Sequence, residues 1–204
     1  MELAGKFIVL DGPDGCGKST QAGQLTEWIQ NSGVEVRSYR DPGTTVIGEK
    51  IRDILLDTAH EEMGDNVEVM LYMAARAQLW KENISADLKA GRCVVLDRWL
   101  SSTCAYQGWA GGFGIEKVIR VAEDTLERVW PDVTVVLDVD TETAAGRMNR
   151  DLDRMEQKGK TYHRKVREGF LKLAELNDSV FVVNACEPIE VVQRTIRQEI
   201  ESRI

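Results

Sequence analysis

The sequence predicts an α/β fold: a five-stranded parallel sheet with helices on both faces, in a three-layer α/β/α sandwich. Short apolar runs, rich in β-branched residues, alternate along the chain with segments in which apolar residues recur every three or four positions. Four of the five runs are continuously apolar, as in strands that are buried on both faces of a parallel sheet. Strands that alternate with helices in this way form right-handed crossovers between parallel strands.

Each element can be placed from its pattern. The expected strands are residues 6–10, 34–39, 93–96, 133–139 and 180–183. Between them, apolar residues at helical spacing form stripes through residues 22–29, 115–129 and 189–200, each of which predicts one buried helix face. No stretch is rich enough in Pro or Ser to act as an interdomain linker. We therefore expect residues 1–204 to form a single domain.

Composition narrows the classes of partner. Lys and Arg number 26 and Asp and Glu 34, so the net charge is −8, which disfavours a nucleic-acid partner or an anionic membrane surface. No apolar run approaches the roughly 18 residues of a membrane span. The four cysteines form no C-x-x-C pair, which disfavours a zinc site. We expect a cytoplasmic protein that binds neither membranes nor nucleic acid.

A glycine-rich loop follows the first expected strand, and residues 12–19 match the pattern G-x-x-x-x-G-K-[ST]. Its glycines let backbone N–H groups point at phosphate oxygens, Lys18 places a positive charge on the β- and γ-phosphates, and Ser19 can bind Mg²⁺. The loop makes the expected fold a P-loop sandwich and predicts a bound nucleoside triphosphate. The residues expected to hold it are Gly12, Pro13, Asp14, Gly15, Cys16, Gly17, Lys18, Ser19 and Thr20.

Two acidic residues lie near this loop. Asp97 closes the third apolar run, as in a Walker B strand whose carboxylate holds Mg²⁺ directly or through water. Ser19 and Asp97 are therefore the expected metal ligands. Asp14 lies inside the loop, where a phosphate would repel its carboxylate unless that carboxylate faces a metal ion or a sugar hydroxyl.

The loop alone fits a kinase, a GTPase switch or a motor-type ATPase. A GTPase would need an Asn-Lys-x-Asp motif after a late strand, which residues 133–139 and 183–187 lack, and a motor ATPase would usually carry a second module. A small kinase with a second pocket for a phosphorylated acceptor fits better. Three arginines near strand ends are candidates to bind the acceptor phosphate: Arg40, Arg76 and Arg98.

Four further segments have distinctive sequences. Residues 40–45 read RDPGTT, and residues 97–108 contain DRW followed by STCAYQG. Residues 68–76 read EVMLYMAAR, and residues 153–156 read DRME. Together with the phosphate loop, these segments resemble the thymidylate kinase family of nucleoside monophosphate kinases over nearly the whole chain. Thr44 departs from the family's R-[DE]-P-G-G-T pattern.

The resemblance implies where the base of dTMP would bind. Tyr72 would stack on the thymine ring, at a position where the family usually has Phe. Arg76 would hydrogen-bond the thymine carbonyl, and Ser102 or Thr103 would lie near the ring nitrogen.

It also implies contacts to the sugar and phosphate. Tyr106 would press against C2′ and exclude a ribose hydroxyl, while Asp14 would accept a hydrogen bond from the 3′-hydroxyl. Arg40 and Arg98 would bind the acceptor phosphate. The implied substrate-binding set is Asp14, Arg40, Tyr72, Arg76, Arg98, Ser102, Thr103, Tyr106 and Gln107.

The family divides by the source of its catalytic arginine. One branch carries it in the phosphate loop, where this chain has Gly15, and the other supplies arginines from a lid. The charged region at residues 147–164 resembles that lid, so we expect a short helical lid that closes over ATP and neutralises charge on the transferred phosphoryl group. The implied catalytic set is Lys18, Arg98, Arg147, Arg150 and Arg154.

The implied reaction is ATP + dTMP → ADP + dTDP, with Mg²⁺ between the β- and γ-phosphates, for dTTP synthesis. Two alternatives remain open: a kinase for another (deoxy)nucleoside monophosphate, and a non-catalytic nucleotide-binding switch. The resemblance also implies a homodimer formed through helices. An apolar stripe at residues 67–79 fits either the internal core or such a dimer interface.

Overall fold

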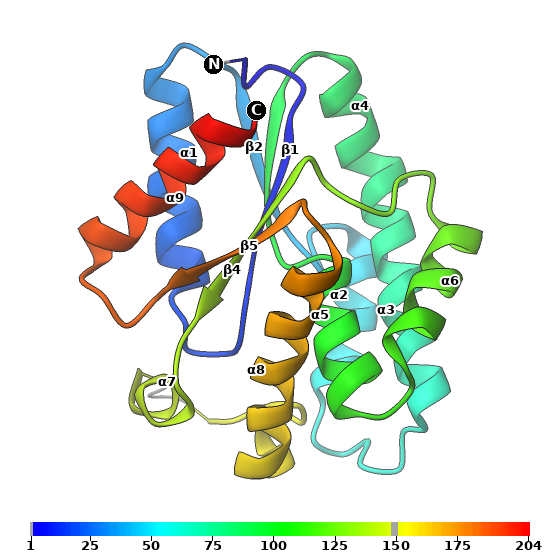
Figure 1. Cartoon of the computed structure of the whole chain (residues 1–204). Coiled ribbons are helices and arrows are strands. Elements are labelled where there is room, and N and C mark those ends of the chain that lie inside the picture. The colour runs from blue at the N-terminus through cyan, green and yellow to red at the C-terminus, as the bar shows by residue number, and fades with distance from the viewer. Residues whose placement is uncertain (1, 148–150) are drawn as a thin grey trace.

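The computed structural model describes residues 2–147 and 151–204, and in that part of the chain five strands form one parallel sheet in the order β2-β3-β1-β4-β5 (Figure 1). The predicted fold class is confirmed. Each expected strand is present, although the second begins at Val36 instead of residue 34. The strands are β1 (Phe7–Asp11), β2 (Val36–Arg40), β3 (Cys93–Asp97), β4 (Val133–Asp138) and β5 (Val180–Asn184).

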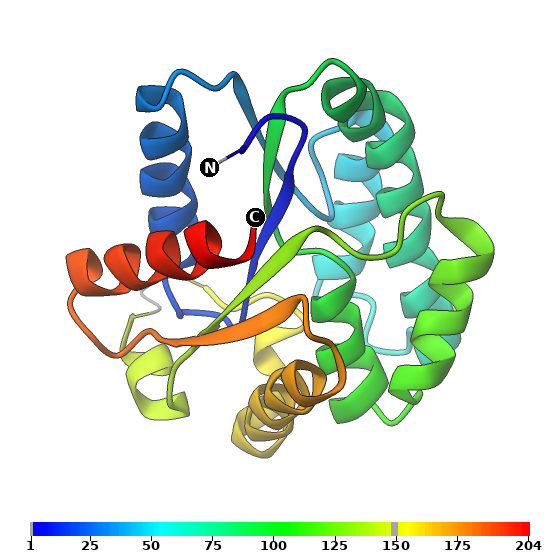
Figure 2. The same ribbon diagram turned by 45° about the horizontal axis from the view of Figure 1, so that its top comes forward.

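Helices cover both faces of this sheet, as Figures 1 and 2 show. One face carries α1 (Lys18–Asn31) and α9 (Ile189–Arg203). The opposite face carries α3 (Asp65–Leu79), α4 (Ser85–Lys89), α5 (Leu100–Thr103), α6 (Ile115–Thr125) and α8 (Gly159–Leu176). The remaining segments are α2 (Val46–Leu56), α7 (Thr141–Arg147), two π-helical segments (Trp80–Ile84 and Cys104–Ala110) and a 3₁₀-helix (Glu156–Lys158).

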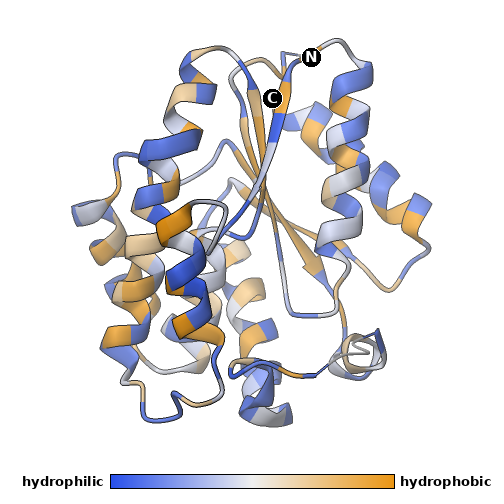
Figure 3. Ribbon diagram, turned by 180° about the vertical axis from the view of Figure 1, so that it is seen from behind, coloured by the Kyte–Doolittle hydropathy of each residue, from blue (hydrophilic) through white to orange (hydrophobic). Residues whose placement is uncertain are grey.

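The central strand β1 divides the core between the two faces. Phe7 and Val9 pack among α3, α6 and α8, whereas Ile8 and Leu10 pack among α1 and α9. All four side chains are fully buried, which explains why the strand is continuously apolar in sequence. In Figure 3 the strands are mostly hydrophobic, whereas hydrophobic and hydrophilic residues alternate along the helices. Among the described residues, no helix combines the length and hydropathy needed to cross a membrane.

The structure corrects one expected helical stripe and shows how a second one is used. The stripe at residues 115–129 predicts a helix through Val129, but α6 ends at Thr125. Leu126 adopts extended backbone while still packing in the core, so it fits the apolar spacing without being helical. In the stripe at residues 67–79, Leu79 is buried whereas Val67 and Met70 are exposed. That stripe therefore serves both the core and an outer surface.

The region expected to form a helical lid, residues 147–164, contains helix in its described part at Arg147, at Glu156–Lys158 and from Gly159 onward. The segment after α7 passes through residues 148–150, which include Arg150 and lie outside the described residues. Residues 151–155 form a turn, the 3₁₀-helix follows, and α8 begins at Gly159. The described part of the lid is thus non-helical at residues 151–155 and helical from Glu156 onward.

Phe170 tests the packing of α8 against the π-helical segment Cys104–Ala110. Its side chain is 1% exposed and meets Tyr106 edge-on at 6.1 Å between ring centroids. We expect Phe170→Ala to lower the free energy of unfolding by about 3–5 kcal/mol, because it opens a cavity that the core cannot refill. Urea unfolding measures this, with Leu176→Ala on the exposed end of α8 as the control. A loss below about 1 kcal/mol for Phe170→Ala would contradict this packing.

Candidate active site

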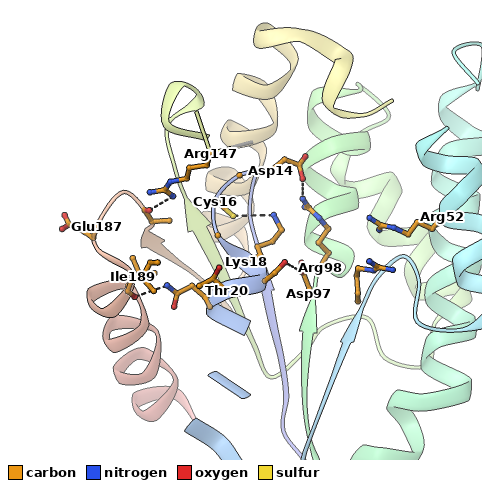
Figure 4. A pocket seen from close by; sticks show the side chains of 17 residues that line it. Asp14, Cys16, Lys18, Thr20, Arg52, Asp97, Arg98, Arg147, Glu187 and Ile189 are labelled. Atoms are coloured by element: carbon orange, nitrogen blue, oxygen red, sulfur yellow. Dashed lines mark hydrogen bonds and ion pairs between the residues drawn. The ribbon is translucent and has the colours of Figure 1, made fainter. Parts of the chain in front are cut away.

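The predicted functional residues gather where the strands end. In a parallel sheet with helices on both faces, ligands bind beyond the carboxyl ends of the strands. Here the phosphate loop follows β1, Arg40 ends β2, and Asp97 and Arg98 follow one another at the end of β3. A cavity of about 760 Å³ opens at this edge (Figure 4). Its lining includes Asp14, Gly15, Cys16, Gly17, Lys18, Ser19, Thr20, Arg40, Arg52, Asp97, Arg98, Arg147, Ile189 and Val192.

The phosphate loop has the backbone that its glycines allow. Gly12, Gly15 and Gly17 have φ values of 134°, 76° and 92°, a region that side chains disfavour. A Cβ atom at Gly15 would lie 2.4 Å from the carbonyl oxygen of Ala144 in α7, so the loop and α7 fit together only with glycine at that position. Lys18 curls over the loop and donates from Nζ to the carbonyl oxygens of Gly12 at 3.1 Å and Pro13 at 2.9 Å.

Ser19 and Asp97 meet at the opening of the loop. The hydroxyl of Ser19 donates to Oδ2 of Asp97 at 3.1 Å, which brings together a serine at the start of α1 and a carboxylate at the end of β3. Hydroxyl and carboxylate oxygens are the ligands that Mg²⁺ prefers, and such sites are usually completed by substrate phosphates and water. The two residues predicted as metal ligands therefore fit a magnesium ion.

Asp14 and Arg98 form an ion pair across the site, and Tyr106 donates from its hydroxyl to Asp14 Oδ2 at 2.7 Å. Burial alone would raise the pKa of the Asp14 carboxyl, but the charges of Arg98 and Lys18 outweigh it and hold this pKa well below its usual range. Asp14 is thus ionised at any physiological pH. Its carboxylate lies where it can accept a hydrogen bond from a ligand.

Arg98 adopts an unusual backbone for an arginine, with φ of 70°. Its Nη1 donates to the carbonyl oxygen of Gly12 at 3.0 Å and to the hydroxyl of Ser102 at 2.8 Å. A left-handed backbone at a non-glycine residue persists only where surrounding contacts fix it, and such residues cluster at functional sites. The guanidinium is thereby fixed between the phosphate loop and α5.

Asp11 supports this arrangement and is a residue that sequence reasoning missed. It is fully buried at the end of β1 and accepts hydrogen bonds from Ser101 at 2.5 Å, Ser102 at 2.6 Å and the backbone N–H of Gly12 at 2.9 Å. A charged residue at the end of a fully apolar strand was the available signal, because a buried carboxylate needs hydrogen-bond partners.

A second, narrower cavity of about 90 Å³ adjoins the first. It collects most of the side chains predicted to bind dTMP. Of the predicted set, those that line it are Asp14, Tyr72, Arg76, Arg98, Ser102, Thr103, Tyr106 and Gln107. Arg40 lines the larger cavity and is not among the described residues that line the narrower one. Its Nη2 forms an ion pair with Glu49 Oε1 at 2.9 Å.

Arg76 is rigidly held in the wall of this cavity, with only 1% of its surface exposed. Its Nε donates to Asp41 Oδ2 at 2.8 Å, and its Nη2 donates to Thr103 Oγ1 at 3.0 Å and to the carbonyl oxygen of Trp99 at 3.2 Å. Nη1 contacts only the weak acceptor Met73 Sδ, at 3.4 Å, among the described residues. That nitrogen retains hydrogen-bonding capacity for a ligand.

Arg52 is a second residue that the sequence analysis missed. It lines both cavities, and its Nη1 donates to the carbonyl oxygen of Pro42 at 3.1 Å. Burial lowers the pKa of its guanidinium, and the nearby charge of Arg40 lowers it further, as expected for a cation held close to another cation. The signal was its spacing: Gly48 and Leu55 are buried on the same side of α2, four residues before and three after.

The lid arginines separate in the structure. Arg147 lines the large cavity, as do Ile189 and Val192, and donates to the carbonyl oxygen of Ala185 at 3.0 Å. Arg154 is buried and binds Glu68 and the carbonyl oxygen of Leu55. Arg150 lies outside the described residues. The lid arginines that can be placed thus lie apart: Arg147 lines the larger cavity, and Arg154 is buried next to Asp153 and Met155, which line the narrower one.

The sheet order and the loop after its first strand define a P-loop nucleotide-binding protein, and the adjoining second cavity is what a phosphotransferase needs for its acceptor. The thymidylate kinase family model matches residues 10–196. Because this match spans most of the chain, the protein belongs to the thymidylate kinase family.

Individual relatives agree with this assignment. A thymidylate kinase of Thermoanaerobacter sp. (strain X514) is 43% identical over 174 residues, which cover 85% of each chain. One from Geobacillus sp. (strain WCH70) is 36% identical over 195 residues, or 93% of each chain. The crystal structure of thymidylate kinase from Ehrlichia chaffeensis superposes with a TM-score of 0.78 at 26% identity, and the match covers 97% of this chain and 99% of that one.

Gly15 tests whether the loop must fit against α7. We expect Gly15→Ala to weaken binding of a fluorescent ATP analogue by about tenfold or more and to lower stability by about 2 kcal/mol, because its Cβ would force the loop and α7 apart. Gly23→Ala is the matched control, since a Cβ at this position in α1 meets no atom of the described residues within 4 Å. Unchanged affinity in Gly15→Ala would contradict the loop geometry.

Proposed function

We propose that this protein transfers the γ-phosphoryl group of ATP to dTMP, producing ADP and dTDP for dTTP synthesis. The observation that carries the proposal is the pair of adjoining cavities, which share Asp14, Arg52 and Arg98, in a chain of the thymidylate kinase family. A switch that only binds a nucleotide has no need of the second cavity.

ATP fits the larger cavity with its phosphates on the loop. Lys18 and the N-terminus of α1 supply positive charge to the β- and γ-phosphates. The adenine base lies between the apolar side chains of Ile189 and Val192 and the guanidinium of Arg147, which can stack on an aromatic ring. Ser19 and Asp97 would hold Mg²⁺, which supplies charge neutralisation at the phosphates when it is bound.

The base of dTMP fits the narrower cavity. Tyr72 offers the face of its ring to thymine, and Arg76 offers Nη1 to the thymine carbonyl, with Ser102 or Thr103 near the ring nitrogen and Gln107 at the cavity wall. Tyr106 lies beside Asp14, and together they recognise the sugar. The Asp14 carboxylate accepts a hydrogen bond from the 3′-hydroxyl, and the Tyr106 ring leaves no space for a 2′-hydroxyl.

The two substrates then meet at Arg98. This guanidinium reaches from the phosphate loop to the acceptor cavity, and with Arg52 and Arg40 it binds the acceptor phosphate. An oxygen of that phosphate attacks the γ-phosphorus in line, the bond to the β–γ bridging oxygen breaks, and ADP leaves. Lys18, Arg98 and arginines of the lid neutralise the charge that is spread over the transferred group. Closure of the lid excludes water, which would otherwise accept the phosphoryl group.

We also propose a homodimer that works in the cytoplasm. Helices α2 and α3 pack against each other and carry five exposed apolar side chains, which support the dimer: Val46, Ile47, Ile54, Val67 and Met70. Exposed apolar groups of this kind mark interfaces. The four free cysteines fit a reducing compartment.

Release of ADP from Mg-ATP with a panel of acceptors tests the function. We expect fast turnover with dTMP, slower turnover with purine monophosphates, and little with UMP, because its 2′-hydroxyl meets Tyr106. Lys18→Ala is the inactive control, which should lose turnover while its unfolding transition is preserved.

The panel also separates the alternatives. Preferred turnover of another monophosphate would retain the kinase but contradict the thymine pocket. Slow ATP hydrolysis that no acceptor accelerates would contradict the kinase and favour a nucleotide-binding switch.

A further inference from the structure

Glu68 is a buried carboxylate behind the acceptor cavity, and the reaction described above gives it no role. It lies on α3, one turn before Tyr72, and only 3% of its surface is exposed. Its Oε1 accepts from Gln107 Nε2 at 2.7 Å, and its Oε2 accepts from Arg154 Nη2 at 2.5 Å. Lys158 lies farther away, with Nζ 3.6 Å from Oε2. Burying an unpaired charge costs free energy, and the contacts with Gln107, Arg154 and Lys158 offset that cost for Glu68.

Arg154 is held from a second direction by α2. Its Nε donates to the carbonyl oxygen of Leu55 at 2.8 Å, and its backbone N–H donates to the carbonyl oxygen of Leu56 at 3.2 Å. These carbonyls belong to the last turn of α2, where carbonyl oxygens have no N–H partner within the helix. The helix dipole also makes a positive charge favourable at this end. The lid is thus attached to the end of α2 and to the middle of α3 through one side chain.

The residues on either side of Arg154 fix the turn that presents it. Asp153 Oδ1 accepts from the backbone N–H groups of Met155 at 2.9 Å and Glu156 at 3.0 Å, and Glu156 Oε2 accepts in return from the N–H of Asp153 at 3.0 Å. This reciprocal pair has the hydrogen-bond pattern of a capping box and fixes the turn just before the 3₁₀-helix. It explains three positions of the Asp-Arg-Met-Glu sequence: the two acids shape the turn, and the arginine between them is directed at Glu68.

The attachment builds part of the acceptor cavity. Asp153 and Met155 line that cavity from the lid, and Gln107 lines it from the π-helical segment Cys104–Ala110. Glu68 therefore joins two walls of the cavity to α3, the helix that carries Tyr72 and Arg76. In the described residues the lid reaches the acceptor cavity through contacts that involve neither the phosphate loop nor Lys18.

We propose that Glu68 is a positioning residue for the acceptor: its ion pair with Arg154 holds residues 153–158 over the dTMP site before ATP binds. The inference rests on the proposed function and deepens it. The described part of the lid then has two parts, Arg147 at the larger cavity and residues 153–158 at the acceptor site. Arg154 acts through Glu68 and does not contact the transferred phosphoryl group.

The test measures dTMP binding without ATP by calorimetry, together with kcat and both KM values. We expect Glu68→Gln and Arg154→Met each to raise the Kd and KM of dTMP about tenfold, with kcat at saturating dTMP and the KM of ATP within about twofold of the wild type. The double variant should bind dTMP no more weakly than either single variant, because both remove the same ion pair. Glu61→Gln, the same change on an exposed residue ahead of α3, is the matched control and should bind normally.

Unchanged dTMP affinity in Arg154→Met, with kcat lowered about a hundredfold or more, would overturn the proposal and make Arg154 a catalytic residue. If Glu68→Gln does not fold, Arg154→Met alone decides between these results, and Arg154→Lys, which keeps the charge, should recover part of the affinity. A wild-type protein that bound no dTMP would instead overturn the proposed function, whereas equal affinity in wild type and variants would overturn only the role of Glu68.

Discussion

The ion pair between Asp14 and Arg98 is the interaction on which the site depends. The two residues are 84 positions apart in the sequence, and they lie just after the adjacent strands β1 and β3. Because the parallel sheet brings these strand ends together, the phosphate loop and the acceptor cavity share one wall. Asp14 remains ionised through the charges of Arg98 and Lys18, and Arg98 in turn is fixed by Gly12, Ser102 and the buried carboxylate of Asp11. Neither residue is placed by its own loop alone.

Phosphoryl transfer requires both neutralisation of charge and positioning of the substrates, and separate groups of residues serve these two needs in the proposed mechanism. In the proposed mechanism the positive charge comes from Lys18, which lines the larger cavity, and from Arg98 and Arg52, which line both cavities. Position is met by residues that hold others: Asp41 holds Arg76, and Glu68 holds Arg154. A preorganised site of this kind needs little rearrangement as charge develops on the transferred group. The positioning residues are nearly or fully buried, which explains why they contribute through geometry.

The sequence predicts the fold and the phosphate-binding loop because both depend on local patterns. Apolar runs set the strands, and the loop works through its own backbone, so Gly12 to Ser19 could be assigned directly. The helix end at Thr125 was missed, since Leu126 is apolar and buried without being helical. Arg52, Asp11 and Glu68 were missed for another reason: their roles come from contacts between segments distant in sequence. Likewise, no sequence pattern separates Arg147 at the donor cavity from Arg154 behind the acceptor cavity.

The central claim is that donor and acceptor lie in two cavities joined through Arg98. A compound that links adenosine to thymidine through a polyphosphate chain tests it most directly, with affinity measured by calorimetry against ATP and dTMP separately. If the cavities are continuous, the linked compound should bind about a hundredfold or more tightly than either substrate, because its second half binds at high effective concentration. That gain should be reduced in Arg98→Ala. Binding no tighter than that of ATP alone would show that the two cavities do not form one site.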